Sequence, residues 1–103
     1  MNKKRLLPDD RKHEILTAAI KVAARPGGWA KLTREAVARE AECADGLISK
    51  YFGTMTNFRR AIMRAAIAGK ELSVIAQGLA DGDSCAQKAT ESLKRKALAT
   101  LRG

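Results

Sequence analysis

Residues 33–52 read TREAVAREAECADGLISKYF and hold two short apolar patterns separated by a break. The first pattern, Thr33 to about Ala41, opens on a residue type that caps helices well. The second covers residues 45–52 and is closed by Gly53, a residue common at helix ends. Helices this short are not stable alone, so the stretch predicts two helices that are joined by a tight turn and packed against other elements.

The sequence on either side of this stretch predicts three further helices. Acidic residues favour a helix start, and a helix over about 9–24 is ended by the Pro-Gly-Gly of residues 26–28. A long apolar register predicts a helix over 56–79. After a loop over 78–84, Ser84 is expected to cap a last helix over 84–101. We therefore expect an all-α fold of about five helices.

The composition supports the same fold class. The chain has 103 residues, of which 19 are alanine and 4% are aromatic. Alanine has the highest helix propensity, whereas sheets draw on β-branched and aromatic residues. Because small side chains bury little apolar area, a core this rich in alanine is marginal, and we expect oligomerisation to contribute stability.

The net charge of +9 indicates a polyanionic partner, most often nucleic acid and less often an anionic membrane surface. The chain has no run of eighteen apolar residues and no signal-peptide pattern, so we expect it to stay in the cytoplasm without a membrane partner.

The chain has few residues that could bind a metal ion, act in redox chemistry or catalyse a reaction. Two cysteines and one histidine cannot build a four-ligand zinc site, and Cys43 and Cys85 are most simply incidental thiols. The chain has no phosphate-binding glycine loop, no paired carboxylates flanking a cleft and no Ser/His/Asp set. We expect no cofactor and no enzymatic activity.

The side chains of residues 33–52 suit a helix-turn-helix, in which the second helix enters the major groove of DNA. Lys50 can donate to guanine or to a phosphate, and Ser49 can hydrogen-bond to either. The amides that open the helix after Thr33 form an anion site, with Arg34 beside them. An ordinary helical hairpin is the alternative interpretation of the same pattern.

The run from Arg11 to Ala66 resembles the DNA-binding domain of the TetR/AcrR family of repressors. The resemblance is carried by ILTAA in the opening helix, a glycine turn, LT before the second helix, VAREA at its end and GLISKYF in the recognition helix. It implies a repressor that binds a palindromic operator as a homodimer.

The resemblance also implies roles for individual residues. Thr33 would contact phosphate, the backbone of Gly46 would approach DNA closely, and Leu47 would contact a base or methyl group. Tyr51 would contact phosphate, while Phe52 would belong to the core.

Several positions depart from the family pattern. Glu42 stands where glycine is usual, which costs on the order of 1 kcal/mol if the residue is left-handed. Ala44 replaces the usual capping serine, so Asp45 is expected either to cap the helix or to be an acidic residue of its first turn. Ser49 and Met55 replace the usual tyrosine and lysine, so DNA affinity would depend on other basic residues. The predicted DNA-binding residues are Lys3, Lys4, Arg5, Lys31, Thr33, Arg34, Ala44, Asp45, Gly46, Leu47, Ser49, Lys50 and Tyr51.

We therefore expect a basic arm at 1–8, a DNA-binding domain at 9–55 with its helix-turn-helix at 33–52, and a helical dimerisation segment at 56–103. About 35 residues follow the matched run, too few to enclose a drug-sized pocket, so no small-molecule inducer is expected. Lys94, Arg95 and Lys96 are most simply a solvated face. The predicted dimer interface consists of Met63, Ile67, Val74, Leu93 and Leu101.

Two other functions fit the same sequence. One is a protein-interaction module, such as an anti-repressor or adaptor, that keeps the helical scaffold without reading DNA. The other is a nucleoid-type protein that coats DNA without sequence preference, for which the net charge alone provides attraction.

Overall fold

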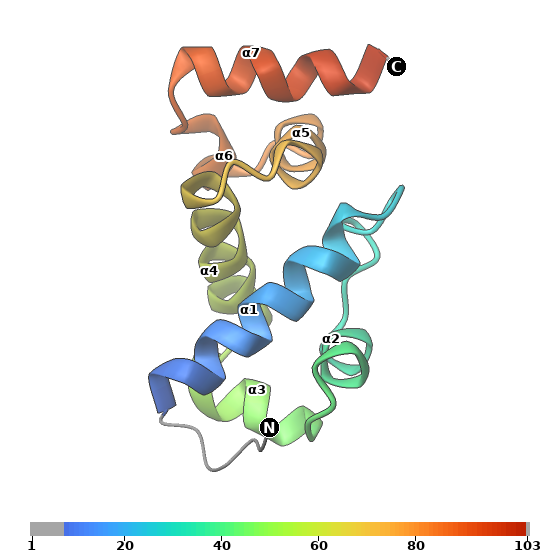
Figure 1. Cartoon of the computed structure of the whole chain (residues 1–103), viewed down its shortest axis with the longest axis vertical. Helices are drawn as coiled ribbons and strands as arrows, with labels where there is room; N and C mark the ends of the chain where they lie inside the picture. The colour runs from blue at the N-terminus through green and yellow to red at the C-terminus, as the bar shows by residue number, and fades with distance from the viewer. Residues whose placement is uncertain (1–7, 103) are drawn as a thin grey trace, which may run out of the picture.

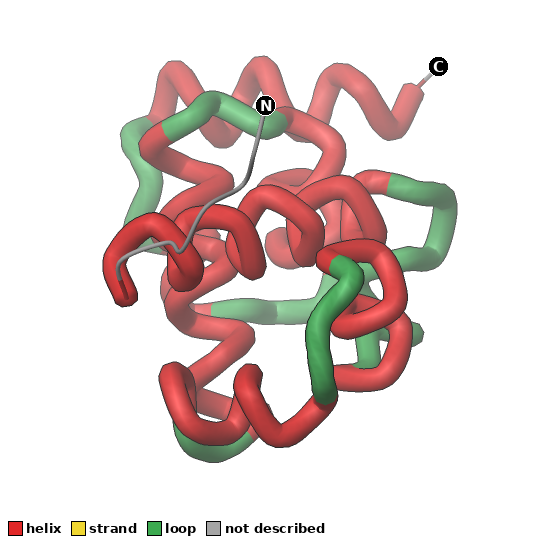
Figure 2. Tube along the Cα trace, turned by 60° about the horizontal axis from the view of Figure 1, so that its bottom comes forward, coloured by secondary structure: helices red, strands yellow, loops and turns green. Residues whose placement is uncertain are grey.

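The computed structural model describes residues 8–102, and over these residues the chain consists of helices and loops (Figure 2). The all-α prediction is confirmed, but the count of five helices is wrong, because seven α-helices and a short 3-10 turn are present in the described part. They are α1 Pro8–Ala24, α2 Arg34–Ala41, α3 Asp45–Phe52, α4 Met55–Ala68, α5 Leu72–Ala80, α6 Ser84–Gln87, α7 Glu91–Ala99 and the 3-10 turn Thr100–Arg102.

The described residues form an elongated body of 41 × 25 × 23 Å. In Figure 1, α2 and α3 lie at the lower end, α1 crosses the middle diagonally and α4 rises beside it. The helices α5 and α6 sit above α4, and α7 lies across the upper end on α5. The chain therefore has two ends that differ in content, with α3 at one and α7 at the other.

The predicted helix over 56–79 is divided into α4 and α5 by a turn at Gly69–Glu71. Lys70 is left-handed, with a φ of 55°. Its N–H donates to the carbonyl of Ile67 (3.1 Å), and the Glu71 N–H donates to Ala66 (2.8 Å). These two bonds form a Schellman motif, which ends a helix by satisfying its last carbonyls. The apolar register continues through this turn, which is why the sequence pattern missed it.

The predicted last helix is also divided, into α6 and α7. Asp83, and not Ser84, caps α6 by accepting from the N–H of Ala86 (2.9 Å), and Thr90 caps α7 by accepting from Leu93 (3.2 Å). The expected loop over 78–84 shrinks to 81–83 because Gly78 is buried inside α5.

Two residues of the predicted dimer interface belong to the core of the chain itself. Met63 and Val74 have no exposed surface, so neither presents an apolar side chain to a second copy. Ile67 and Leu93 are half-buried against the core. Leu101 is 55% exposed and Leu98, which was not predicted, is 43% exposed.

The turn between α2 and α3 has the strained backbone that the sequence suggested. Glu42 is left-handed, with a φ of 57°, and its N–H donates to Arg39 (3.3 Å) while the next amide, of Cys43, donates to Ala38 (2.9 Å). Of the two roles expected for Asp45, that of a cap is wrong, since Ala44 is the N-cap and makes no side-chain capping bond. Asp45 is instead the acidic residue of the first helical turn.

The end of α1 is capped by side chains from α5. The Gln77 side-chain NH2 donates to the carbonyls of Ala23 (2.6 Å) and Arg25 (3.2 Å), and the Ser73 hydroxyl donates to Ala24 (2.9 Å). The Gln77 side-chain oxygen accepts from the N–H of Trp29 (3.0 Å). Carbonyls at a helix end lack partners within the helix, so α5 supplies partners that α1 cannot.

Arg59 of α4 also binds the segment that connects α1 to α2. Its guanidinium donates to the carbonyls of Trp29 (2.8 Å) and Leu32 (3.4 Å) and lies 4.9 Å from the centroid of the Trp29 ring. Trp29 itself is buried. The segment that leads from α1 into α2 is thus positioned by residues of α4 and α5.

We predict that Gln77→Leu lowers the free energy of unfolding by about 2–4 kcal/mol, because the part-buried Ala23 carbonyl and Trp29 N–H lose their partner. Urea denaturation followed by circular dichroism measures the change. Gln87→Leu is the matched control, since Gln87 is an exposed glutamine of α6 and should change stability by less than about 0.5 kcal/mol. Equal effects of the two substitutions would contradict the capping role of Gln77.

We predict that Glu42→Gly raises the free energy of unfolding by about 0.5–1 kcal/mol, because glycine adopts the left-handed conformation without steric cost. Glu42→Ala removes the carboxylate but keeps a Cβ at the same φ, so it should give no comparable gain. A gain with alanine as large as that with glycine would mean that charge, and not backbone strain, sets the effect.

Candidate nucleic-acid interface

The two short helices predicted from residues 33–52 are present, with α2 beginning one residue after Thr33 and α3 covering 45–52. The Thr33 hydroxyl oxygen accepts from the N–H of Ala36 (3.1 Å), which makes Thr33 the N-cap. The remaining first amides of an α-helix have no acceptor inside the helix. Together with the helix dipole, they make the start of α2 suited to an anionic oxygen.

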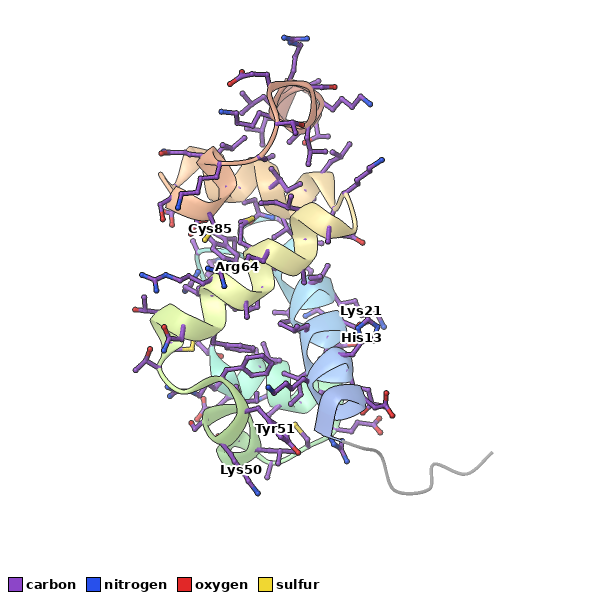
Figure 3. The ribbon with its side chains drawn as sticks, turned by 90° about the vertical axis from the view of Figure 1, so that its left-hand side faces the viewer. His13, Lys21, Lys50, Tyr51, Arg64 and Cys85 are labelled. Atoms are coloured by element: carbon purple, nitrogen blue, oxygen red, sulfur yellow. The ribbon has the colours of Figure 1, made fainter. Side chains whose placement is uncertain are left out.

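One side of α3 is anchored in the core and the other faces solvent. Ile48 has no exposed surface, and the centroid of the Phe52 ring lies 5.0 Å from that of the Phe58 ring. Gly46, Ser49 and Lys50 are exposed. Figure 3 shows Lys50 at the lower end of the molecule, pointing away from the body. The helix therefore presents a polar face while apolar contacts on its other side hold it in place.

An open groove of about 410 Å³ lies between the start of α2 and the outer face of α3. It brings together five of the predicted DNA-binding residues, from both helices. The residues that line it are Leu32, Thr33, Arg34, Glu35, Asp45, Gly46, Ser49 and Met55.

Arg34 is the basic residue that lines this groove. Its Nε atom is buried and has no hydrogen-bond partner among the described residues. An arginine beside free helix-start amides and a threonine hydroxyl provides the donors that a phosphate oxygen requires.

The other predicted residues do not line the groove. Lys31 is exposed just before α2, and Ala44 is exposed in the turn. Leu47 is half-buried. Tyr51 is half-buried and packs against the core, so it has a structural role besides any contact with a ligand. Lys3, Lys4 and Arg5 of the predicted arm lie outside the described residues.

The charge of this region is lower than that of the chain as a whole. Residues 33–53 carry three basic and four acidic side chains, a net charge of −1, against +9 for the whole chain. Two of the acidic residues, Glu35 and Asp45, line the groove itself. Most of the attraction for a polyanion must therefore come from basic residues outside α2 and α3.

Cys43 and Cys85 are both free thiols. Burial raises the pKa of the Cys43 thiol, Arg11 lowers it, and Asp45 and Glu14 raise it further. The thiol of Cys43 is therefore protonated at neutral pH and a weak nucleophile. Among the described residues, no group of three or more His, Cys, Asp or Glu side chains could hold a metal ion.

Two residues that position this interface were not predicted, namely Arg59 and Gln77. Both hold the segment before α2 through backbone atoms, and neither belongs to a motif. The sequence feature that could have indicated Gln77 is a polar side chain within an apolar helical stretch, which is a weak signal for a capping role.

None of the described helices is long and apolar enough to cross a membrane. Comparisons with protein families, with curated proteins and with solved structures find no match for this chain. The assignment of a nucleic-acid interface therefore depends on the residues of α2 and α3 and on the groove that they form.

Proposed function

We propose that the protein is a sequence-specific DNA-binding repressor that inserts α3 into the major groove. The observation that carries this proposal is the groove between the start of α2 and the exposed face of α3 at one end of the molecule. It combines helix-start amides, Arg34 and the exposed polar residues of a short helix. A helix with one anchored and one polar face fits the width of the major groove.

The contacts divide into two kinds. Lys50 and Ser49 face solvent on α3 and would donate to base edges, which specifies sequence. Thr33, Arg34 and the first amides of α2 would bind phosphate, which fixes position. A Cβ at Gly46 would meet no atom within 4 Å, so the backbone there is open to close approach by DNA.

The protein would act as a homodimer on a palindromic operator whose half-sites lie about 34–36 Å apart. Because α7 lies at the end opposite α3, pairing end to end through α7 would point the two α3 helices in opposite directions. The copies must therefore pair side by side. By occupying a promoter, the dimer would repress transcription, and a falling protein level or a protein antagonist would relieve this repression.

A second function, a protein-interaction module on the same scaffold, is favoured by one observation. The net charge of residues 33–53 is −1, and Glu35 and Asp45 line the groove, which weakens attraction for phosphate. Binding to random DNA does not separate the two functions, because the charge of the chain alone produces it. A footprint on a defined sequence separates them.

We predict that sequences selected from a random DNA pool share a palindrome, and that Lys50→Ala weakens binding to it by about tenfold or more, since a base contact is worth about 1–3 kcal/mol. Tyr51→Phe removes a hydroxyl without disturbing the core and should weaken binding to all sequences alike. Gel-shift titration measures both effects.

Lys70→Ala is the matched control for Lys50→Ala, because Lys70 is an exposed lysine in the turn between α4 and α5 and, like Lys50, takes part in none of the ion pairs among the described residues. It removes the same charge and should not change the preference for the palindrome. An unchanged preference in Lys50→Ala, or no enriched sequence at all, would remove α3 from the role of recognition helix.

A further inference from the structure

The helix α7 lies across the end of the molecule opposite α3 and contacts mainly α5 (Figure 1). Ala97 is fully buried and Leu93 half-buried, and these residues attach the helix to the body. In Figure 3, α7 is seen end-on at the top with side chains projecting around it. Much of its surface is thus open to a partner.

The open surface of this end is strongly basic. Residues 84–101 carry four basic side chains and one acidic side chain, Glu91. Lys94 is bound locally, because its ammonium pairs with Glu91 (3.1 Å) and donates to the carbonyl of Gln87 (3.0 Å). Lys88, Arg95 and Lys96 are exposed, and none of the ion pairs among the described residues involves them.

The two ends of the molecule therefore differ in the features that could bind a polyanion. The α3 end has a groove with a net charge of −1 over residues 33–53, whereas the α6–α7 end presents three exposed cations that take part in none of the ion pairs among the described residues. Cations of this kind gain affinity for duplex DNA by releasing condensed counterions, independently of base sequence.

We propose that the α6–α7 end is a second, sequence-independent surface for duplex DNA, so that one chain that holds a duplex at α3 binds another at α7 and bridges the two. The proposal rests on the proposed function, because α3 must hold the first duplex. The basic residues that carry it are Lys88, Arg95 and Lys96.

A membrane surface fits this end less well than DNA does. An amphipathic helix that lies in a bilayer interface needs a broad apolar face toward the lipid. In α7 the apolar residues Leu93 and Ala97 are used against the body, which leaves Leu98 and Leu101 as the exposed large apolar side chains.

The test is a two-duplex capture assay with the full chain. A selected-sequence duplex is fixed on beads, the protein is added, and a labelled random-sequence duplex is offered as the second ligand. The parent protein should retain the second duplex at low salt and release it steeply as salt rises.

The variant is Arg95→Gln/Lys96→Gln, which removes two exposed charges from α7. The matched control is Arg60→Gln/Lys70→Gln, two exposed cations of α4 and of the turn after it, which take part in none of the ion pairs among the described residues and do not line the pocket beside Lys88. The α7 variant should bind the bead-fixed duplex like the parent but retain about tenfold less of the second duplex. The control should retain both. Circular dichroism and sedimentation velocity verify that fold and oligomeric state are unchanged.

Three results would overturn the inference. If the α7 variant still captures the second duplex, the paired α3 helices of a dimer bridge the duplexes and α7 does not. If the control loses capture equally, only total charge matters. If the parent captures no second duplex, but co-sediments with phosphatidylserine vesicles in a manner that the α7 variant loses, the basic end binds lipid.

Failure of the proposed function gives a different result. If no palindrome is enriched, the protein does not read sequence, and the assay is run with a random-sequence duplex on the beads; capture of a second duplex that depends on Arg95 and Lys96 would still support the α7 surface. Conversely, a clear footprint without capture supports the repressor and rejects the bridge.

Discussion

The structure depends on how the end of α1 is joined to the start of α2. The carbonyls of residues 23–25 have no partners within α1, and Gln77 and Ser73 of α5 provide them. The same glutamine binds the N–H of Trp29, and Arg59 binds the Trp29 carbonyl. Unsatisfied polar groups in a partly buried segment cost more than the bonds themselves contribute, so this junction holds only when α4 and α5 are in place.

This constraint links the two halves of the chain. Residues about fifty positions downstream set the direction in which the chain enters α2, and α2 then sets where α3 lies. The groove between α2 and α3 therefore depends on α4 and α5, of which only α4 contributes a lining residue, Met55. The helices α4, α5 and α6 contribute mainly to the core of a single chain, because Met63, Val74 and Ala86 are fully buried in it.

The charge distribution has a second consequence. The chain is strongly basic, but residues 33–53, which form α2, α3 and the turn between them, are slightly acidic, and the cations are concentrated elsewhere. Under the proposed function, the groups that contact bases are separate from those that provide general attraction for DNA, so each set can be tuned without the other. In this molecule the separation is spatial as well, because α3 and α7 occupy opposite ends of a 41 Å body.

The sequence by itself determined the all-α class and the bounds of α1, α2 and α3 to within about one residue, because caps and glycines act on their immediate neighbours. It also indicated the left-handed Glu42 and the exposed face of α3. Only the tertiary structure decided that residues 56–79 break at Lys70, that Met63 and Val74 are core, and that Gln77 caps α1. An apolar register shows which side of a helix is buried, but the partner that buries it, and the polar groups satisfied across that contact, depend on residues far apart in the chain.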